Sequence, residues 1–162
     1  MDDLDTRVHL LLRAAGHTVA TAESLTGGRL AVHFTDTPGA SETYLGGVVT
    51  YATELKASVL DVPPAVIEEQ GVVSAACAEA MASGVRKLTG STFGVSTTGV
   101  AGPDEQEGKP AGTVFVGISG PGVLEATALD LDGDRTSVQE GTCAKALEAL
   151  VAILEREETP LG

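Results

Sequence analysis

The sequence predicts an α/β fold, a three-layer α/β/α sandwich with a mixed, mainly parallel sheet. Strand-like apolar segments alternate with helix-like segments as far as residue 98, which is typical of parallel sheets covered on both faces. Gly120-Pro121-Gly122 then separates two consecutive strand-like segments, and this hairpin signal requires at least one antiparallel strand. With 162 residues, 43% of them hydrophobic, the chain can build one core, so we expect a single domain over 1–162.

Helical periodicity and breaker residues define the expected helices. Apolar residues recur at helical spacing from Leu4 to Leu12, and Gly16 ends that run. Further helices are expected at 26–35, 54–60, 74–88 and 134–157. Pro63-Pro64 should stop the helix at 54–60, and Ser74 is a candidate N-cap for the helix that follows.

Short β-branched and glycine-bounded segments define the expected strands. They lie at 18–22, 46–51, 92–98, 111–119 and 123–131, and the segment 46–51 has the apolar run of a buried strand. Pro38 to Ser41 should form a turn, and residues 99–109 should form a loop rich in Gly, Pro and acidic residues.

Composition excludes several classes of function. The chain carries 23 Asp and Glu against 10 Lys and Arg, a net charge of −13, so we expect no nucleic-acid partner and no polybasic membrane contact. No apolar run approaches the ~18 residues of a membrane span, which favours a cytoplasmic protein. The two cysteines are expected to be buried hydrophobes, and the three histidines lack metal-ligand spacing, so neither metal nor cofactor is expected.

Ligands of open α/β sheets bind beyond the carboxyl ends of parallel strands, which directs attention to three segments. In the first, Ser24 stands where a strand turns into a helix, followed by Thr26, Gly27 and Gly28. Free N–H groups at this helix start could bind an anion or stabilise an oxyanion. Ser24 or Thr26 could instead simply cap the helix, and this segment alone favours the capping role.

The other two segments follow the next strands. Tyr51 ends one strand, and Lys56 follows within the first turns of a helix, where a desolvated lysine could serve as base for a hydroxyl nucleophile. From spacing alone, a solvated surface lysine is at least as good an interpretation. Residues 97–103 form the third segment, rich in hydroxyls and glycine.

Together these motifs resemble the CinA C-terminal domain family, the nicotinamide-nucleotide amidohydrolases. The resemblance extends from Leu4 to Leu154 and is carried by TAESLTGG at 21–28, VTYATELK at 49–56, GVAGP at 99–103, KPAGTV at 109–114 and GDR at 133–135. It implies hydrolysis of the carboxamide of nicotinamide mononucleotide to nicotinate mononucleotide and ammonia, in pyridine-nucleotide salvage. It also implies that Ser24 is the nucleophile, Lys56 the base and Tyr51 an assisting hydroxyl.

The same resemblance implies which residues bind the substrate and whether a second domain is expected. The expected substrate-binding residues are Thr26, Gly27, Gly28, Thr98, Gly99, Ala101, Gly102 and Arg135, with Arg135 near the phosphate. Gln139 stands where the family often has a second Arg, Leu25 where Cys is frequent, and Thr53 where Asn is frequent. Some members carry an N-terminal molybdopterin-binding-like domain, and a standalone form is expected here.

Two alternatives to this activity stay open. One is a nucleotide-binding or competence-related regulatory protein without catalysis, and the other is a hydrolase of a different small amide. The intact set of Ser24, Tyr51 and Lys56 favours an enzyme. The expected partner is a small nucleotide substrate, and we also expect a homo-oligomer, with a dimer as the first candidate.

Overall fold

A computed structural model describes residues 3–158 of the protein, and residues 1–2 and 159–162 of the predicted domain lie outside this range. The helices are α1 (Leu4–Ala15), α2 (Arg29–Thr35), α3 (Thr53–Leu60), α4 (Pro64–Gln70), α5 (Ala75–Thr89) and α6 (Arg135–Glu158), and a 3₁₀ turn, η1, spans Ala40–Glu42. The strands are β1 (Val19–Glu23), β2 (Tyr44–Val49), β3 (Phe93–Gly99), β4 (Thr113–Gly120) and β5 (Val123–Asp130).

The strands form one five-stranded mixed sheet in the order β2-β1-β3-β4-β5. β2, β1 and β3 run parallel, whereas β4 is antiparallel to β3 and β5 is antiparallel to β4. The α/β fold with a mixed sheet and the hairpin at Gly120 are therefore confirmed. The prediction of a mainly parallel sheet was too strong, because two of the four pairs of neighbouring strands are parallel and two are antiparallel.

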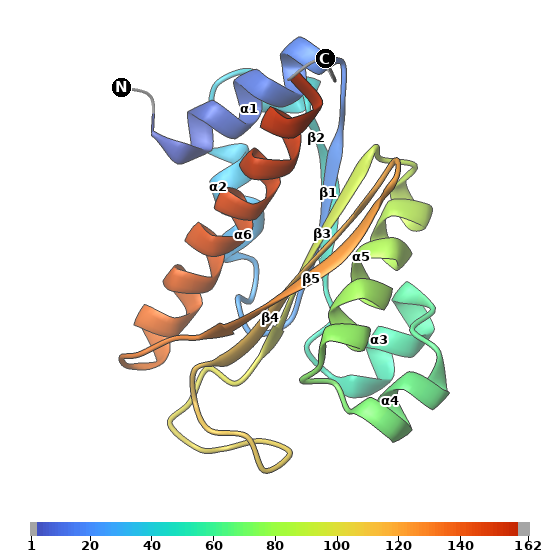
Figure 1. Cartoon of the computed structure of the whole chain (residues 1–162), viewed down its shortest axis with the longest axis vertical. Coiled ribbons are helices and arrows are strands. Elements are labelled where there is room, and N and C mark those ends of the chain that lie inside the picture. The colour runs from blue at the N-terminus through green and yellow to red at the C-terminus, as the bar shows by residue number, and fades with distance from the viewer. Residues whose placement is uncertain (1–2, 159–162) are drawn as a thin grey trace.

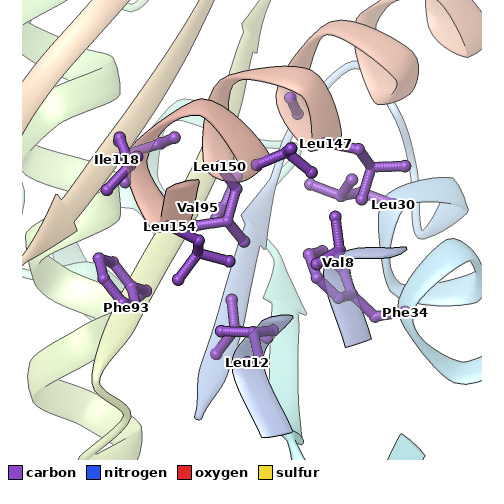
Figure 2. Close-up of a cluster of buried hydrophobic side chains, with 14 of the residues drawn as sticks. Val8, Leu12, Leu30, Phe34, Phe93, Val95, Ile118, Leu147, Leu150 and Leu154 are labelled. Carbon is purple, nitrogen blue, oxygen red and sulfur yellow. The ribbon is translucent and has the colours of Figure 1, made fainter. Parts of the chain in front are cut away.

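Helices cover the sheet from both sides. Figure 1 shows α1, α2 and α6 on one side of the strands and α3, α4 and α5 on the other. Side chains of α1, α2 and α6 pack on the sheet in a hydrophobic cluster, of which Figure 2 shows Val8, Leu12, Leu30, Phe34, Phe93, Val95, Ile118, Leu147, Leu150 and Leu154. A second cluster, which includes Leu60, Val72, Met81 and Val85, fills the space under α3 and α5.

Local chemistry accounts for the ends of the helices. Asp3 caps α1 by accepting a hydrogen bond from the Thr6 N–H, and Gly16 ends the same helix in the left-handed conformation with φ 70°. Ser74 caps α5, as predicted. No helix within residues 3–158 combines the length and the hydropathy needed to cross a membrane.

The structure differs from the predicted elements in three places. Pro64 begins a helix, α4, because proline suits the first helical position, where no N–H is needed. β2 spans Tyr44–Val49, and its residues alternate between half-buried and exposed because the strand lies at the edge of the sheet; it is not the buried strand predicted at 46–51. α2 starts only at Arg29, which leaves residues 24–28 as an irregular turn after β1.

Candidate active site

The site lies where the three parallel strands end. The chain leaves β1 to form β2 on one side and later returns to form β3 on the other, so β1 is the point at which the strand order reverses. Ser24 directly follows β1, and Thr50 and Tyr51 follow β2. A cavity of about 380 Å³ opens here, lined by residues 24–25, 51, 53, 56, 72–73, 98–106 and 135.

Ser24 and Lys56 meet in the wall of this cavity. The Nζ atom of Lys56 lies 3.1 Å from the Ser24 Oγ, 2.7 Å from the Thr50 carbonyl oxygen and 3.3 Å from the Tyr51 carbonyl oxygen. Lys56 is only 1% exposed, because it lies on the same buried face of α3 as Leu60, one helical turn later. Lys56 is thus the buried partner of a hydroxyl and not a solvated surface lysine.

Burial also changes the acid–base chemistry of Lys56. Desolvation lowers the pKa of this ammonium, and negative charge on Cys77, where its thiolate forms, and on Glu107 opposes that shift without cancelling it. The neighbouring thiol of Cys77 has a pKa raised to about 11 by burial, so it is protonated at neutral pH and offers no negative charge to hold the ammonium. The environment therefore favours a lysine that can be neutral and act as a base.

A buried carboxylate shapes the turn that carries Ser24. Glu23 is 1% exposed and accepts hydrogen bonds from the Thr26 hydroxyl (2.6 Å) and from the N–H groups of Gly28 (3.2 Å), Leu30 (2.8 Å) and Ala31 (3.1 Å). These donors satisfy a carboxylate that would otherwise be costly to bury. The start of α2 is therefore occupied by Glu23 and does not face the cavity.

Some of the other N–H groups in the turn after β1 donate hydrogen bonds to the main chain, and others do not. Gly27 donates to the carbonyl oxygen of Ser24, and Ser24 itself donates to the carbonyl oxygen of Thr97. The N–H groups of Leu25 and Thr26 donate to no acceptor within residues 3–158. The free N–H donors of this turn therefore belong to residues that lie nearer to Ser24 in the sequence than the predicted Gly27 and Gly28 do.

Arg135 joins two walls of the cavity. Its guanidinium donates to the Gly102 carbonyl oxygen and, over 2.9 Å, to the Tyr51 hydroxyl. Tyr51 is 60% exposed, so its ring lies at the mouth of the cavity. The structure does not bring the Tyr51 hydroxyl to Ser24; it is the main-chain oxygen of Tyr51 that reaches the catalytic lysine candidate.

Hydrogen bonds connect the acidic loop after β3 to residues 72 and 73, which also line the cavity. The Glu107 carboxylate accepts hydrogen bonds from the N–H groups of Val72 (3.0 Å) and Val73 (2.9 Å), and Lys109 donates to the Val73 carbonyl oxygen. The Thr98 hydroxyl donates to the carbonyl oxygen of Val72 over 2.6 Å. This part of the loop therefore fixes the cavity wall, where the sequence predicted only a loop rich in Gly, Pro and acidic residues.

The structure brings many of the predicted site residues to one cavity. Its lining includes Ser24, Tyr51, Lys56, Thr98, Gly99, Ala101, Gly102 and Arg135. Thr26, Gly27 and Gly28 do not line it: Thr26 and Gly28 donate to the Glu23 carboxylate, and Gly27 donates to the Ser24 carbonyl oxygen. Within residues 3–158, no three His, Cys, Asp or Glu side chains gather in a group suited to a metal ion.

Sequence reasoning missed the supporting residues of the site. Glu23 precedes Ser24 at the end of a buried strand, and an acid in that position is a signal that could have pointed to a buried cap. The sequence comparison with the family pattern marks Gln139 only as a replacement of a frequent arginine. It is 6% exposed and does not line the cavity; its side-chain amide donates to the Leu25 carbonyl oxygen over 2.9 Å.

Comparison with known proteins places this chain in a family. A family model described as the CinA C-terminal domain matches residues 1–154. A CinA-like protein of Frankia casuarinae is 45% identical over 94% of this chain and 35% of its own length. A CinA-like protein of Geobacter sp. strain M21 is 44% identical over 98% of this chain and 39% of its own length. The chain thus spans little more than a third of these curated relatives.

Solved structures share the whole fold. A competence-damaged protein (CinA) superfamily protein from Klebsiella pneumoniae 700603 superposes with a TM-score of 0.92 at 35% identity, covering 94% of this chain and 96% of that one. The competence/damage inducible protein CihA from Agrobacterium tumefaciens superposes with a TM-score of 0.88 at 32% identity, covering 93% of both chains.

Proposed function

The chain belongs to the CinA C-terminal domain family, and we propose that it hydrolyses the carboxamide of nicotinamide mononucleotide to nicotinate mononucleotide and ammonia. The observation that carries the proposal is the contact between the buried Lys56 amine and the Ser24 hydroxyl in the wall of a cavity. A hydroxyl within reach of a desolvated amine is the arrangement that a serine hydrolase with a lysine base requires.

The acceptors around Lys56 orient its lone pair. A neutral amine has two N–H bonds and one lone pair, and the carbonyl oxygens of Thr50 and Tyr51 can only accept hydrogen bonds. When both N–H bonds point to these carbonyls, the lone pair is left facing the Ser24 hydroxyl. Neutral Lys56 is thereby oriented to accept the Ser24 proton.

The proposed reaction then proceeds in two halves. Ser24 Oγ bonds to the carboxamide carbon while its proton passes to Lys56 Nζ, and the carbonyl oxygen becomes an oxyanion. The N–H group of Leu25, a residue of the cavity lining, is the available donor for that oxyanion. Collapse of the intermediate breaks the C–N bond, and ammonia leaves with the proton from Lys56. Water, deprotonated by Lys56, then hydrolyses the ester and releases Ser24.

The part of the cavity at Arg135 suits the phosphate of the substrate. The protein has a net charge of −13, so a phosphate must be recognised by local donors. Arg135 has five N–H groups, of which two are directed at Gly102 and Tyr51, so donors remain for a phosphate oxygen. The N–H groups of Ala101 and Gly102 donate to no acceptor among the described residues and lie in the same lining.

A substrate panel tests the proposal. Purified protein is incubated with nicotinamide mononucleotide, nicotinamide riboside, free nicotinamide and glutamine, while ammonia is quantified and products are separated by chromatography. We expect ammonia and nicotinate mononucleotide in equal amounts from the mononucleotide, with much slower release from the others. Saturable binding of the mononucleotide without ammonia would instead identify a regulatory nucleotide-binding protein, and faster turnover of another amide would reassign the substrate.

A further inference from the structure

We propose that Gln139 is a positioning residue for the reaction at Ser24, an inference that rests on the function proposed above. Gln139 lies in the first turns of α6, far from Ser24 in the sequence. Its side-chain Nε2 donates to the Leu25 carbonyl oxygen over 2.9 Å, in a buried contact. Gln139 therefore touches the residue that directly follows the nucleophile without lining the cavity.

This hydrogen bond fixes the plane of the Leu25–Thr26 peptide. In a planar trans peptide the C=O and N–H bonds point in opposite directions. Because the Leu25 carbonyl points at α6, the Thr26 N–H must point away from α6. Ser24 Oγ faces Lys56 on α3, which Figure 1 shows across the sheet from α6. Thr26 itself does not line the cavity, but Leu25 does, so the bond to Gln139 fixes the residue beside Ser24 whose own N–H donates to no described acceptor.

The other contacts of the turn do not hold this peptide. Glu23 holds the Thr26 hydroxyl and the N–H groups at the start of α2, and Gly27 donates to the Ser24 carbonyl oxygen. Among the described residues, Gln139 is the donor for the Leu25 carbonyl oxygen. Losing that donor leaves the buried carbonyl unsatisfied and lets the peptide rotate, which displaces Leu25 and misaligns its free N–H beside Ser24.

Conservative substitutions at Gln139 distinguish the loss of its hydrogen bond to Leu25 from the loss of its packing in the core. Gln139→Met keeps the length but removes the amide, Gln139→Glu is nearly isosteric but presents acceptors to a carbonyl, and Gln139→Asn keeps an amide on a shorter arm. Thr142→Val is the matched control. Thr142 is fully buried on the same helix, but its hydroxyl donates to Val138 and makes no hydrogen bond to the turn after Ser24.

A reaction independent of the natural substrate provides the first readout. A fluorophosphonate probe forms a bond between Ser24 Oγ and phosphorus while the P–F bond breaks, fluoride leaves and the hydroxyl proton passes to Lys56. The phosphonyl oxygen draws on the same N–H donor as a substrate carbonyl. The rate of labelling is followed by intact-protein mass spectrometry for the wild type and each variant, with urea denaturation as a check that each is folded.

We expect every folded Gln139 variant to label roughly 10- to 100-fold more slowly than the wild type, with Thr142→Val unchanged. With nicotinamide mononucleotide, kcat should fall by a similar factor while KM stays within about threefold. Wild-type rates in the folded Gln139 variants, or an equal loss in Thr142→Val, would overturn the positioning role. If wild-type Ser24 failed to label, the nucleophile itself would be wrong, and the positioning role would be overturned with it.

Discussion

Replacing Lys56 by arginine tests whether a neutral amine is required at the site. Lys56 is 1% exposed and its amine contacts the Ser24 hydroxyl, so its neutral form is the base in the proposed mechanism. Arginine retains the charge and the donors, but its pKa lies above about 12, so less than about 10⁻⁴ of it is neutral at pH 8. A positioned base contributes roughly 10²- to 10⁴-fold. We therefore expect Lys56→Arg to lower kcat by about 10³-fold or more.

The assay is ammonia release from nicotinamide mononucleotide across a pH series, with Lys87→Arg, a change at an exposed lysine, as the control. Because burial lowers the pKa of Lys56 from its ordinary value of 10.5, wild-type activity should rise with pH and level off above that lowered pKa. Lys87→Arg should follow the wild-type profile. A Lys56→Arg variant with more than a few per cent of wild-type kcat, or a profile that falls as pH rises toward that lowered pKa, would refute the role of the neutral amine.

Two further predictions concern the phosphate and the stability of the fold. Arg135→Ala should lower kcat/KM for nicotinamide mononucleotide by roughly 10- to 100-fold and hardly affect the riboside, since one charged hydrogen bond is worth about 1.5–3 kcal/mol; equal losses on both substrates would show that Arg135 only maintains the cavity wall. His33 is partly buried, which lowers its pKa, but its hydrogen bonds to Asp5 and Glu140 outweigh burial and raise the pKa above the ordinary 6.5. The stabilisation from protonated His33 is thus complete below 6.5 and lost as pH rises through the raised pKa. Urea denaturation should therefore show the advantage of wild type over His33→Asn shrinking as the pH rises above 6.5, and an advantage independent of pH would contradict this.

Much of the fold could be predicted because its signals are local. Strands buried in the middle of the sheet must be apolar, and helices that cover a sheet must carry an apolar face, so their alternation is visible in the sequence. Helix α4 could not be predicted in this way, because it has only seven residues and begins at Pro64, and a proline pair is typical of a segment that ends a helix. The edge position of β2 could not be predicted either, because Leu45, Val48 and Val49 give the strand the composition of a buried one.

The site could be predicted only as far as strand order allows. Ser24, Thr98 and Lys56 all lie at or after the carboxyl ends of strands, so their convergence follows from an open parallel sheet. The direction in which each side chain points does not follow from the strand order. That Tyr51 turns its hydroxyl toward Arg135, and that Gln139 points to Leu25, depends on how α6 packs against the turn after β1. The sequence alone holds no signal for that packing.

The measurement that tests the central claim most directly is turnover of nicotinamide mononucleotide by the wild type and by Ser24→Ala, with Ser41→Ala, a change at an exposed serine, as control. Ammonia and nicotinate mononucleotide are quantified, and binding of the mononucleotide to each protein is measured by calorimetry. The proposed mechanism predicts turnover by wild type and Ser41→Ala, and a Ser24→Ala variant that binds but releases no ammonia. Turnover by Ser24→Ala above a few per cent of the wild-type rate, or none by the folded wild type, would contradict it.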